Sequence, residues 1–299
     1  MSSSYEIKRQ RGYYGFLIPG LILFTLIVVL PFLANTYFSF TKWQGIGAPE
    51  WIGLANYQKA LQDSQFWQSF KNNILLIFAI TIVPTVLGLF LSAFLFEYVS
   101  KHLSKGITNF FRSAYYLPQI IPVVAAAVTW KWILQPDWGV ANYLLDVIGL
   151  SQYQHDWLGS ADTALGSIML MMVWFQLGYP LVIFMAAYQR IDPEIWEAAA
   201  IDGATWFQRY TRITLRQILP EIYVVILTTV IHALKVFGQV YVMTGGGPGH
   251  ATSVASYYSY QNFFEKANVG YGATIATVLT VVVMLVMVIN VRIQQRTEA

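Results

Sequence analysis

Six long apolar segments constrain this chain more than any other feature of its sequence. Each has roughly the 20 residues that a helix needs to cross a hydrocarbon core about 30 Å thick. Lipid offers no partners for backbone N–H and C=O groups, so helices are the elements that satisfy those groups there. The sequence therefore predicts an all-α, polytopic membrane protein with about six transmembrane helices, in which residues 1–299 form one transmembrane domain. The expected spans are residues 14–38, 73–96, 113–134, 165–189, 221–243 and 271–290.

The composition agrees with this prediction and narrows the kinds of partner. Hydrophobic residues make up 56% of the chain and charged residues 11%. Aromatic residues, which gather at both membrane boundaries, make up 16%. The formal net charge is only +3 and the basic residues are spread along the chain, which is not typical of a nucleic-acid-binding protein. We therefore expect membrane lipid, and no nucleic acid, among the partners.

The distribution of Lys and Arg predicts how the spans are oriented, because loops rich in these residues stay in the cytoplasm. One side of the six-span arrangement carries twelve basic residues and the other carries four. The twelve are Lys8, Arg9, Arg11, Lys101, Lys105, Arg112, Arg190, Arg209, Arg212, Arg216, Arg292 and Arg296, and the four are Lys42, Lys59, Lys71 and Lys266. Both termini are therefore expected in the cytoplasm.

The sequence lacks the motifs of common catalytic and nucleotide-binding sites. It has no P-loop pattern, no HExxH helix and no GxSxG elbow. It has no cysteine, and its four histidines are scattered, so we expect no metal site. The glycine-rich run at residues 244–249 lacks the lysine of a phosphate-binding loop. We predict that the chain is not an enzyme by itself and binds no cofactor.

Residues that favour the start and the end of a helix lie between the fourth and fifth expected spans. Asp192 can cap a helix, Pro193 suits its first position, and Glu194 places a negative charge near the positive helix end. This helix should stop near Asp202 and Gly203, because glycine readily adopts the left-handed conformation that ends helices. A second helix then restarts. The residues alone leave two interpretations open: an elbow that contacts a partner, or a helix lying on lipid headgroups.

The same segment resembles a known signature. Glu197, Ala198 and Ala199 are followed by Gly203 and then by Ile213, Thr214 and Leu215 at the spacing of the EAA motif, which is found in permease subunits of binding-protein-dependent ABC importers. Arg216 departs from that pattern, which often has proline there. Further stretches are similar to the carbohydrate and glycerol-phosphate type of this family, namely Phe110–Arg112, Pro136–Gly139, Leu234–Phe237 and Tyr241–Gly249.

The resemblance implies a complex of two permeases and two ATPases in a bacterial or archaeal cytoplasmic membrane. An extracytoplasmic solute-binding protein would deliver a sugar, oligosaccharide or related polyol, and ATP and Mg²⁺ would bind the ATPase subunits. The cytoplasmic loop, about residues 190–220, would dock on an ATPase. The coupling residues implied are Glu197, Ala198, Ala199, Asp202, Gly203, Ile213 and Leu215. An ion-coupled secondary transporter or channel is the alternative, although no clear repeat and no mid-span carboxylate favours it.

Polar residues within the spans are candidates for the solute pathway. Thr228, His232, Lys235 and Gln239 follow a helical spacing that predicts one polar face of the fifth span. A lysine facing lipid costs about 2.5 to 3.5 kcal/mol, so this face should contact protein or water. Trp174, Gln176 and Tyr179 are further candidates, near a kink expected at Pro180 in the fourth span. Each set has a second interpretation, as contacts that pack helices together.

Overall fold

The computed structural model describes residues 15–99 and 105–298, which are mostly helical. The strands in these ranges form one antiparallel ladder of β1 (Thr41–Lys42) and β2 (Glu50–Trp51). The predicted all-α class is therefore confirmed. Lys8, Arg9, Arg11 and Lys101, which supported the predicted orientation, lie outside the described residues. The chain divides into two compact units, and the single domain stays a prediction.

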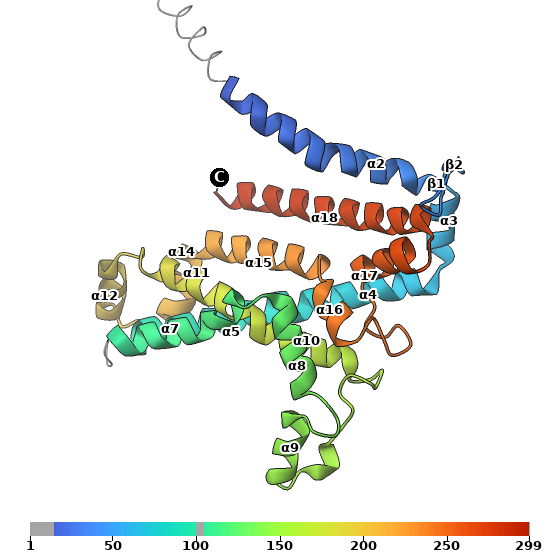
Figure 1. The fold of residues 1–299 in the computed structure, drawn as a ribbon. Helices are drawn as coiled ribbons and strands as arrows, with labels where there is room; N and C mark the ends of the chain where they lie inside the picture. Colours follow the sequence, from blue (N-terminus) through green and yellow to red (C-terminus); the bar gives the residue numbers. More distant parts are fainter. Residues whose placement is uncertain (1–14, 100–104, 299) are drawn as a thin grey trace, which may run out of the picture. The chain divides into compact units, whose positions relative to one another are not determined.

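The first unit comprises residues 15–63 and 259–278. Its helices are η1 (Thr25–Val29), α2 (Leu30–Ser39), α3 (Ala55–Gln62), η6 (Gln261–Glu265) and the first part of α18 (Val269–Glu298). In this unit α2 and α18 lie side by side, as Figure 1 shows, and polar side chains join them. Asn35 Nδ2 donates to Thr277 Oγ1 at 3.0 Å, and Thr274 Oγ1 donates to the carbonyl of Ser39 at 3.0 Å.

The second unit comprises residues 64–258 and 279–298. Of its membrane-length stretches, Ser64–Val99 alternates α and π segments and Ala164–Tyr188 consists of two consecutive α-helices. The elements are α4 (Ser64–Ile77), η2 (Phe78–Ile82), α5 (Val83–Ala93), η3 (Phe94–Val99), α7 (Lys105–Ile120), α8 (Val123–Ile133), α9 (Val140–Val147), η4 (Ser151–Tyr153), α10 (Ala164–Gln176), α11 (Gly178–Tyr188), α12 (Pro193–Ile201), α13 (Trp206–Arg209), η5 (Tyr210–Thr214), α14 (Leu215–Gln217), α15 (Leu219–Leu234), α16 (Gly238–Met243) and most of α17 (Ala255–Tyr260).

Within the described residues, four helical stretches are long and apolar enough to cross a membrane. They are Gly15–Ser39, Ser64–Val99, Ala164–Tyr188 and Val269–Gln295. They correspond to the first, second, fourth and sixth expected spans, and the prediction of a polytopic membrane protein is confirmed. Trp206–Gln217 and Leu219–Leu234 pass the same test together but are bent by 68°.

The expected third span, residues 113–134, is not one helix. α7 ends at Ile120 and α8 begins at Val123. Between them Pro122 has extended backbone angles, φ −54° and ψ 129°. Proline cannot donate a helical hydrogen bond, and it disfavours a helical conformation in the residue before it. The kink expected from Pro122 is therefore a full break between two helices, and the third crossing stays a prediction.

The expected fifth span, residues 221–243, is also interrupted. α15 ends at Leu234 because Asn73 of α4 takes up its last carbonyls, donating from Nδ2 to Ala233 at 3.1 Å and to Leu234 at 3.4 Å. Carbonyls at the end of a helix lack the donors that a continuing helix would provide, and that of Ala233 also accepts from the backbone N–H of Val236 at 3.4 Å. Asn73 is fully buried, and its Oδ1 accepts from the backbone N–H of Ala255 at 2.9 Å. The expectation of a helix that continues to Met243 is therefore wrong, while the number of membrane crossings stays a prediction.

Candidate functional site

The first helix of the segment with the EAA spacing forms as its residues predict. The Asp192 side chain accepts a hydrogen bond from the backbone N–H of Glu194 at 3.0 Å, and Pro193 occupies the first turn of α12. The helix ends at Ile201, and two residues later Gly203 has a φ of +80°, a conformation that an L-residue with a Cβ adopts at a cost. The N–H of Ala204 then bonds back to the carbonyl of Ala199 at 3.0 Å. The predicted start and stop are both confirmed.

A second helical piece follows directly and turns into the fifth apolar helix. Thr205 and Gln208 form a capping box, in which each side chain bonds the backbone N–H of the other residue. From there α13, η5 and α14 continue to Gln217, and α15 leaves at an angle of 68°. We call residues 192–218 the elbow.

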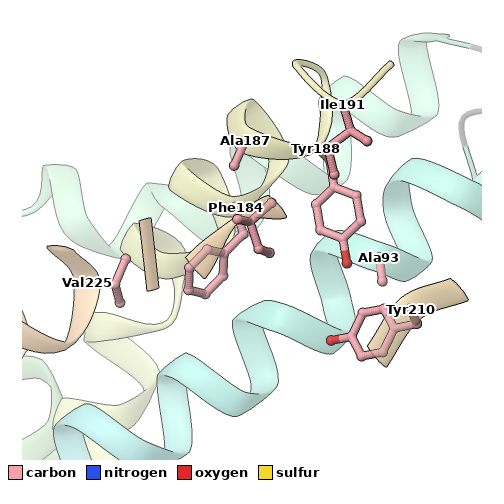
Figure 2. Close-up of a cluster of buried hydrophobic side chains, with 8 residues drawn as sticks. Ala93, Phe184, Ala187, Tyr188, Ile191, Tyr210 and Val225 are labelled. Atoms are coloured by element: carbon pink, nitrogen blue, oxygen red, sulfur yellow. The ribbon is translucent and has the colours of Figure 1, made fainter. Parts of the chain in front are cut away.

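One side of the elbow packs on a buried hydrophobic cluster. Figure 2 shows Tyr188, Ala93 and Tyr210 together at one end of this cluster and Phe184 and Val225 at the other. These residues come from α5, α11, η5 and α15, so the cluster fastens the elbow to three apolar helices. Because protein interiors are close-packed, an elbow held in this way moves together with the helices beneath it.

Two tryptophans add polar contacts to this packing. Trp196 of α12 donates from Nε1 to Thr214 Oγ1 at 3.2 Å, which ties the first helix of the elbow to the second. Trp206 of α13 stacks on Tyr210, with ring centroids 5.2 Å apart, and its Nε1 donates to the carboxylate of Glu97. The elbow is therefore bonded internally and also to η3.

The other side of the elbow is open to solvent. Glu197, Ala198, Asp202 and Gly203 are exposed, Ala199 is half-buried, and the side chain of Ile201 is 87% exposed. We call these six residues the open face.

The remaining coupling residues implied by the resemblance lie elsewhere. Ile213 and Leu215 are half-buried, and Leu215 packs against the hydrophobic cluster. The structure therefore separates the implied set into an open face and two supporting residues. Beneath α12, Glu97, Glu197 and Arg209 line a small pocket. Within residues 15–99 and 105–298, no group of three His, Cys, Asp or Glu side chains could hold a metal ion.

The polar stripe expected on the fifth span is interrupted. Lys235 caps the C-terminus of α15 rather than lying within a helix, and Gln239 belongs to α16. Lys235 and His232 are exposed, whereas Gln239 is buried and Thr228 donates to the carbonyl of Val224 at 2.8 Å. The helical spacing therefore unites only Thr228 and His232 on one helix, with Lys235 at its end.

The candidates in the fourth span have separate surroundings. Gln176 is buried, and Gln119 of α7 donates from Nε2 to its Oε1 at 3.4 Å and to the carbonyl of Phe175 at 3.1 Å. Trp174 is 40% exposed and its ring lies 5.7 Å from that of Trp130. Tyr179 packs against the hydrophobic cluster under the elbow. The structure therefore does not bring these three side chains together into one site.

The family comparison agrees with the geometry of the elbow. Residues 98–299, which include the whole elbow, match the family described as binding-protein-dependent transport system inner membrane component. The chain belongs to this family. It is therefore an ABC transporter permease and a multi-pass membrane protein.

Relatives and solved structures cover nearly the whole permease. A probable ABC transporter permease of Bacillus subtilis is 36% identical over 267 residues, 89% of each chain. The trehalose/maltose transport system permease of Thermococcus litoralis is 28% identical, over 98% of this chain and 97% of its own. The structure of a bacterial alginate ABC transporter, in complex with a periplasmic protein bound to an alginate pentasaccharide, matches with a TM-score of 0.81 and 25% identity. That match covers 98% of this chain and 96% of the other.

Two asparagines, Asn72 and Asn142, form hydrogen bonds that no sequence motif predicts. Asn72 donates from Nδ2 to the carbonyls of Ala251 at 2.9 Å and Ser253 at 2.7 Å, which fixes the glycine-rich loop. Asn142 bonds the carbonyls of Pro136 and His155 in the same way, both at 3.0 Å. The signal available for Asn72 and Asn73 is a pair of amides at the start of an apolar segment, where buried polar groups need partners.

Proposed function

We propose that this chain is the permease subunit of an importer for a sugar, oligosaccharide or related polyol. It forms the solute pathway with a second permease, and two ATPase subunits drive the pathway through the elbow. The observation that carries this proposal is the two-sided elbow: one side is packed on a core shared by three apolar helices, and the other presents an open face. A partner that moves the open face therefore moves the helices.

The open face suits a close protein contact. Ala198 and Gly203 have little or no side chain, so a partner surface can approach the backbone, and Ile201 offers an apolar side chain to bury. Glu197 is exposed, and within the described residues it forms no salt bridge. Its carboxylate is therefore available to a basic residue of the ATPase, and such charges set the orientation of a contact.

ATP and Mg²⁺ bind the ATPase subunits in this proposal, and the permease itself catalyses no reaction. The elbow faces the cytoplasm together with both termini, which follows from the excess of Lys and Arg on that side. An extracytoplasmic binding protein delivers the solute to the opposite side. The proposed location is the cytoplasmic membrane of a bacterium or archaeon.

The solute class rests on relatives whose names specify trehalose and maltose in one case and alginate in another. His232 and Lys235 are exposed at the end of an apolar helix, where lipid contact is unfavourable for a charge. We assign them to the wall that this permease shares with the second one. Thr228 and Gln239 border this wall. Trp174, Gln176 and Tyr179 are assigned to positioning the fourth span rather than to one binding site.

The test is purification of the chain from its native membrane in mild detergent, followed by mass spectrometry of the proteins that accompany it. For each copy of this chain we expect one copy of a second permease and two ATPase subunits with a P-loop. Reconstitution with the binding protein should then give ATP-dependent uptake of a radiolabelled oligosaccharide. Recovery of this chain alone from several detergents would contradict the proposal and favour a self-sufficient transporter.

A further inference from the structure

Three lysines of the first unit surround one pocket. Lys42 of β1, Lys59 of α3 and Lys266 after η6 line it together with Trp43 and neutral residues. None of the described residues that line it is acidic. A pocket with three ammonium groups and no carboxylate in its lining favours an anionic ligand.

Buried hydrogen bonds fix the walls of this pocket. Asn56, only 8% exposed, donates from Nδ2 to the carbonyls of Ser39 at 3.0 Å and Thr41 at 2.9 Å. The N–H of Gly270 donates to the carbonyl of Trp43 at 3.2 Å. A Cβ on Gly270 would lie 2.0 Å from the carbonyl oxygen of Thr41, so this approach requires glycine. The lysines are therefore attached to a rigid junction of α2, α3 and α18.

Two carboxylates, those of Glu50 and Asp63, lie near this pocket without lining it. Lys42 lies opposite Glu50 in the two-stranded ladder. The Nζ of Lys59 lies 4.3 Å from the ring centroid of Tyr271, whose hydroxyl donates to Asp63 at 2.6 Å. Neither Glu50 nor Asp63 is among the described residues that line the pocket, so all the charged residues of the lining are basic.

The position of the pocket in the chain indicates the source of the anion. Lys42 follows the end of α2 by three residues, and Lys266 precedes the start of α18 by three, so the pocket lies where two membrane-length helices end. Aromatic rings gather at the same level, with Trp43 stacked on Phe38 at 4.3 Å. Such rings mark the boundary between lipid and water, and lysines near a membrane surface attract anionic lipid headgroups.

We propose that this pocket binds the phosphate of an anionic phospholipid of the surrounding membrane. The acyl chains would lie on the apolar side of α2 that leads to the pocket, where Leu30, Leu33 and Tyr37 are 49%, 54% and 48% exposed. The three lysines contact the phosphate, and Trp43 lies at the level of the glycerol. The bound lipid thereby holds the ends of α2 and α18 at the membrane boundary.

The test compares lipid retention by the purified importer and by its variants, using native mass spectrometry after exchange into phosphatidylcholine containing phosphatidylglycerol. The triple variant Lys42→Gln, Lys59→Gln, Lys266→Gln removes the charges. Each lysine near an anionic lipid surface contributes roughly a fivefold factor in affinity, so retention of phosphatidylglycerol should weaken on the order of 100-fold. Lys71→Gln is the matched control, because Lys71 is exposed but does not line the pocket. Arginine at all three positions should preserve retention.

A second arm separates the lipid from a protein partner. The affinity of the solute-binding protein is measured in discs of phosphatidylcholine alone. If the triple glutamine variant weakens that affinity while phosphatidylglycerol retention is unchanged, the lysines bind an acidic side chain of that protein and the proposal is wrong. Equal retention by the triple variant and Lys71→Gln would also overturn it. If the triple variant does not assemble, Lys266→Gln alone should lower retention about fivefold.

Discussion

The indole N–H of Trp206 donates a hydrogen bond to the carboxylate of Glu97, which joins the second helical piece of the elbow to the end of the helix Ser64–Val99. The same indole stacks on Tyr210 of the buried cluster, with an interplanar angle of 8°. The elbow therefore contacts this helix both through a polar bond and through packed rings. We therefore expect a displacement of the open face to be transmitted to the helix Ser64–Val99.

Trp206→Phe should weaken the contact between the elbow and the helix Ser64–Val99 without unfolding the elbow. Phenylalanine keeps a ring to stack on Tyr210 but has no donor for Glu97. Because the indole is 43% exposed, the loss of folding free energy should stay below about 1 kcal/mol. We expect ATP hydrolysis to persist in proteoliposomes while the solute moved per ATP falls several-fold. Phe207→Leu is the control, since Phe207 is 62% exposed. An unchanged ratio in Trp206→Phe would show that the bond transmits nothing.

Gly203→Ala should loosen the attachment of the ATPase. The φ of +80° at Gly203 costs an alanine roughly 1 to 2 kcal/mol, and an added Cβ meets no atom within 4 Å, so the effect acts through the backbone alone. Gly149→Ala is a matched control, with φ +75° and equally open space but outside the elbow. Co-purification of the ATPase should fall about tenfold in the first variant only. Equal recovery of the ATPase with both variants would mean that Gly203 is not part of the contact with the ATPase.

Glu197→Lys should disrupt the same contact by charge. Reversing a charge that pairs across a protein interface typically costs about 2 to 5 kcal/mol, so ATPase attachment should drop well beyond tenfold. Glu194→Lys makes the same change on the same helix, in its first turn, at another exposed residue. The pull-down of the ATPase by each variant is the measurement. A similar loss in both variants would mean that net charge, rather than the position of Glu197, governs attachment.

The elbow could be predicted from the sequence because its signals are local. The cap at Asp192 and the left-handed stop at Gly203 depend on residues within one or two turns, and the structure contains both. The same holds for the apolar helices, whose length and composition alone identify them.

The exact places of the helix breaks could not be predicted, because local sequence does not distinguish a proline within a helix from one that ends it, and because distant residues take part. Pro118 and Pro122 both predict a kink, but Pro118 lies inside α7 and only Pro122 lies at a break. The end of α15 depends on Asn73, which lies 160 residues from Ala233 in the chain. A polar stripe drawn on one ideal helix therefore failed at Lys235, where that capping ends the helix.

Asn73→Leu should be strongly destabilising. The side chain is fully buried, and its loss leaves the carbonyl of Leu234 and the N–H of Ala255 without the bonds that it makes and removes one of the bonds to the carbonyl of Ala233. Each buried polar group left unsatisfied costs about 1 to 3 kcal/mol. We expect a clear drop in the thermal unfolding temperature of the detergent-purified importer. Asn109→Leu, at an exposed position of α7, should leave that temperature nearly unchanged. Equal temperatures for the two variants would mean that α15 ends for another reason.

Lys235→Met should lower transport while sparing assembly. Lys235 is exposed at the end of α15, so a methionine of similar length removes the charge without opening a cavity. If the residue lines the pathway, solute uptake falls several-fold and the ATPase still co-purifies in full. Lys71→Met provides the comparison, because Lys71 is an exposed lysine on α4. Loss of the second permease on purification, with uptake falling in proportion, would instead identify Lys235 as a contact between helices. Unchanged uptake and assembly would exclude both roles.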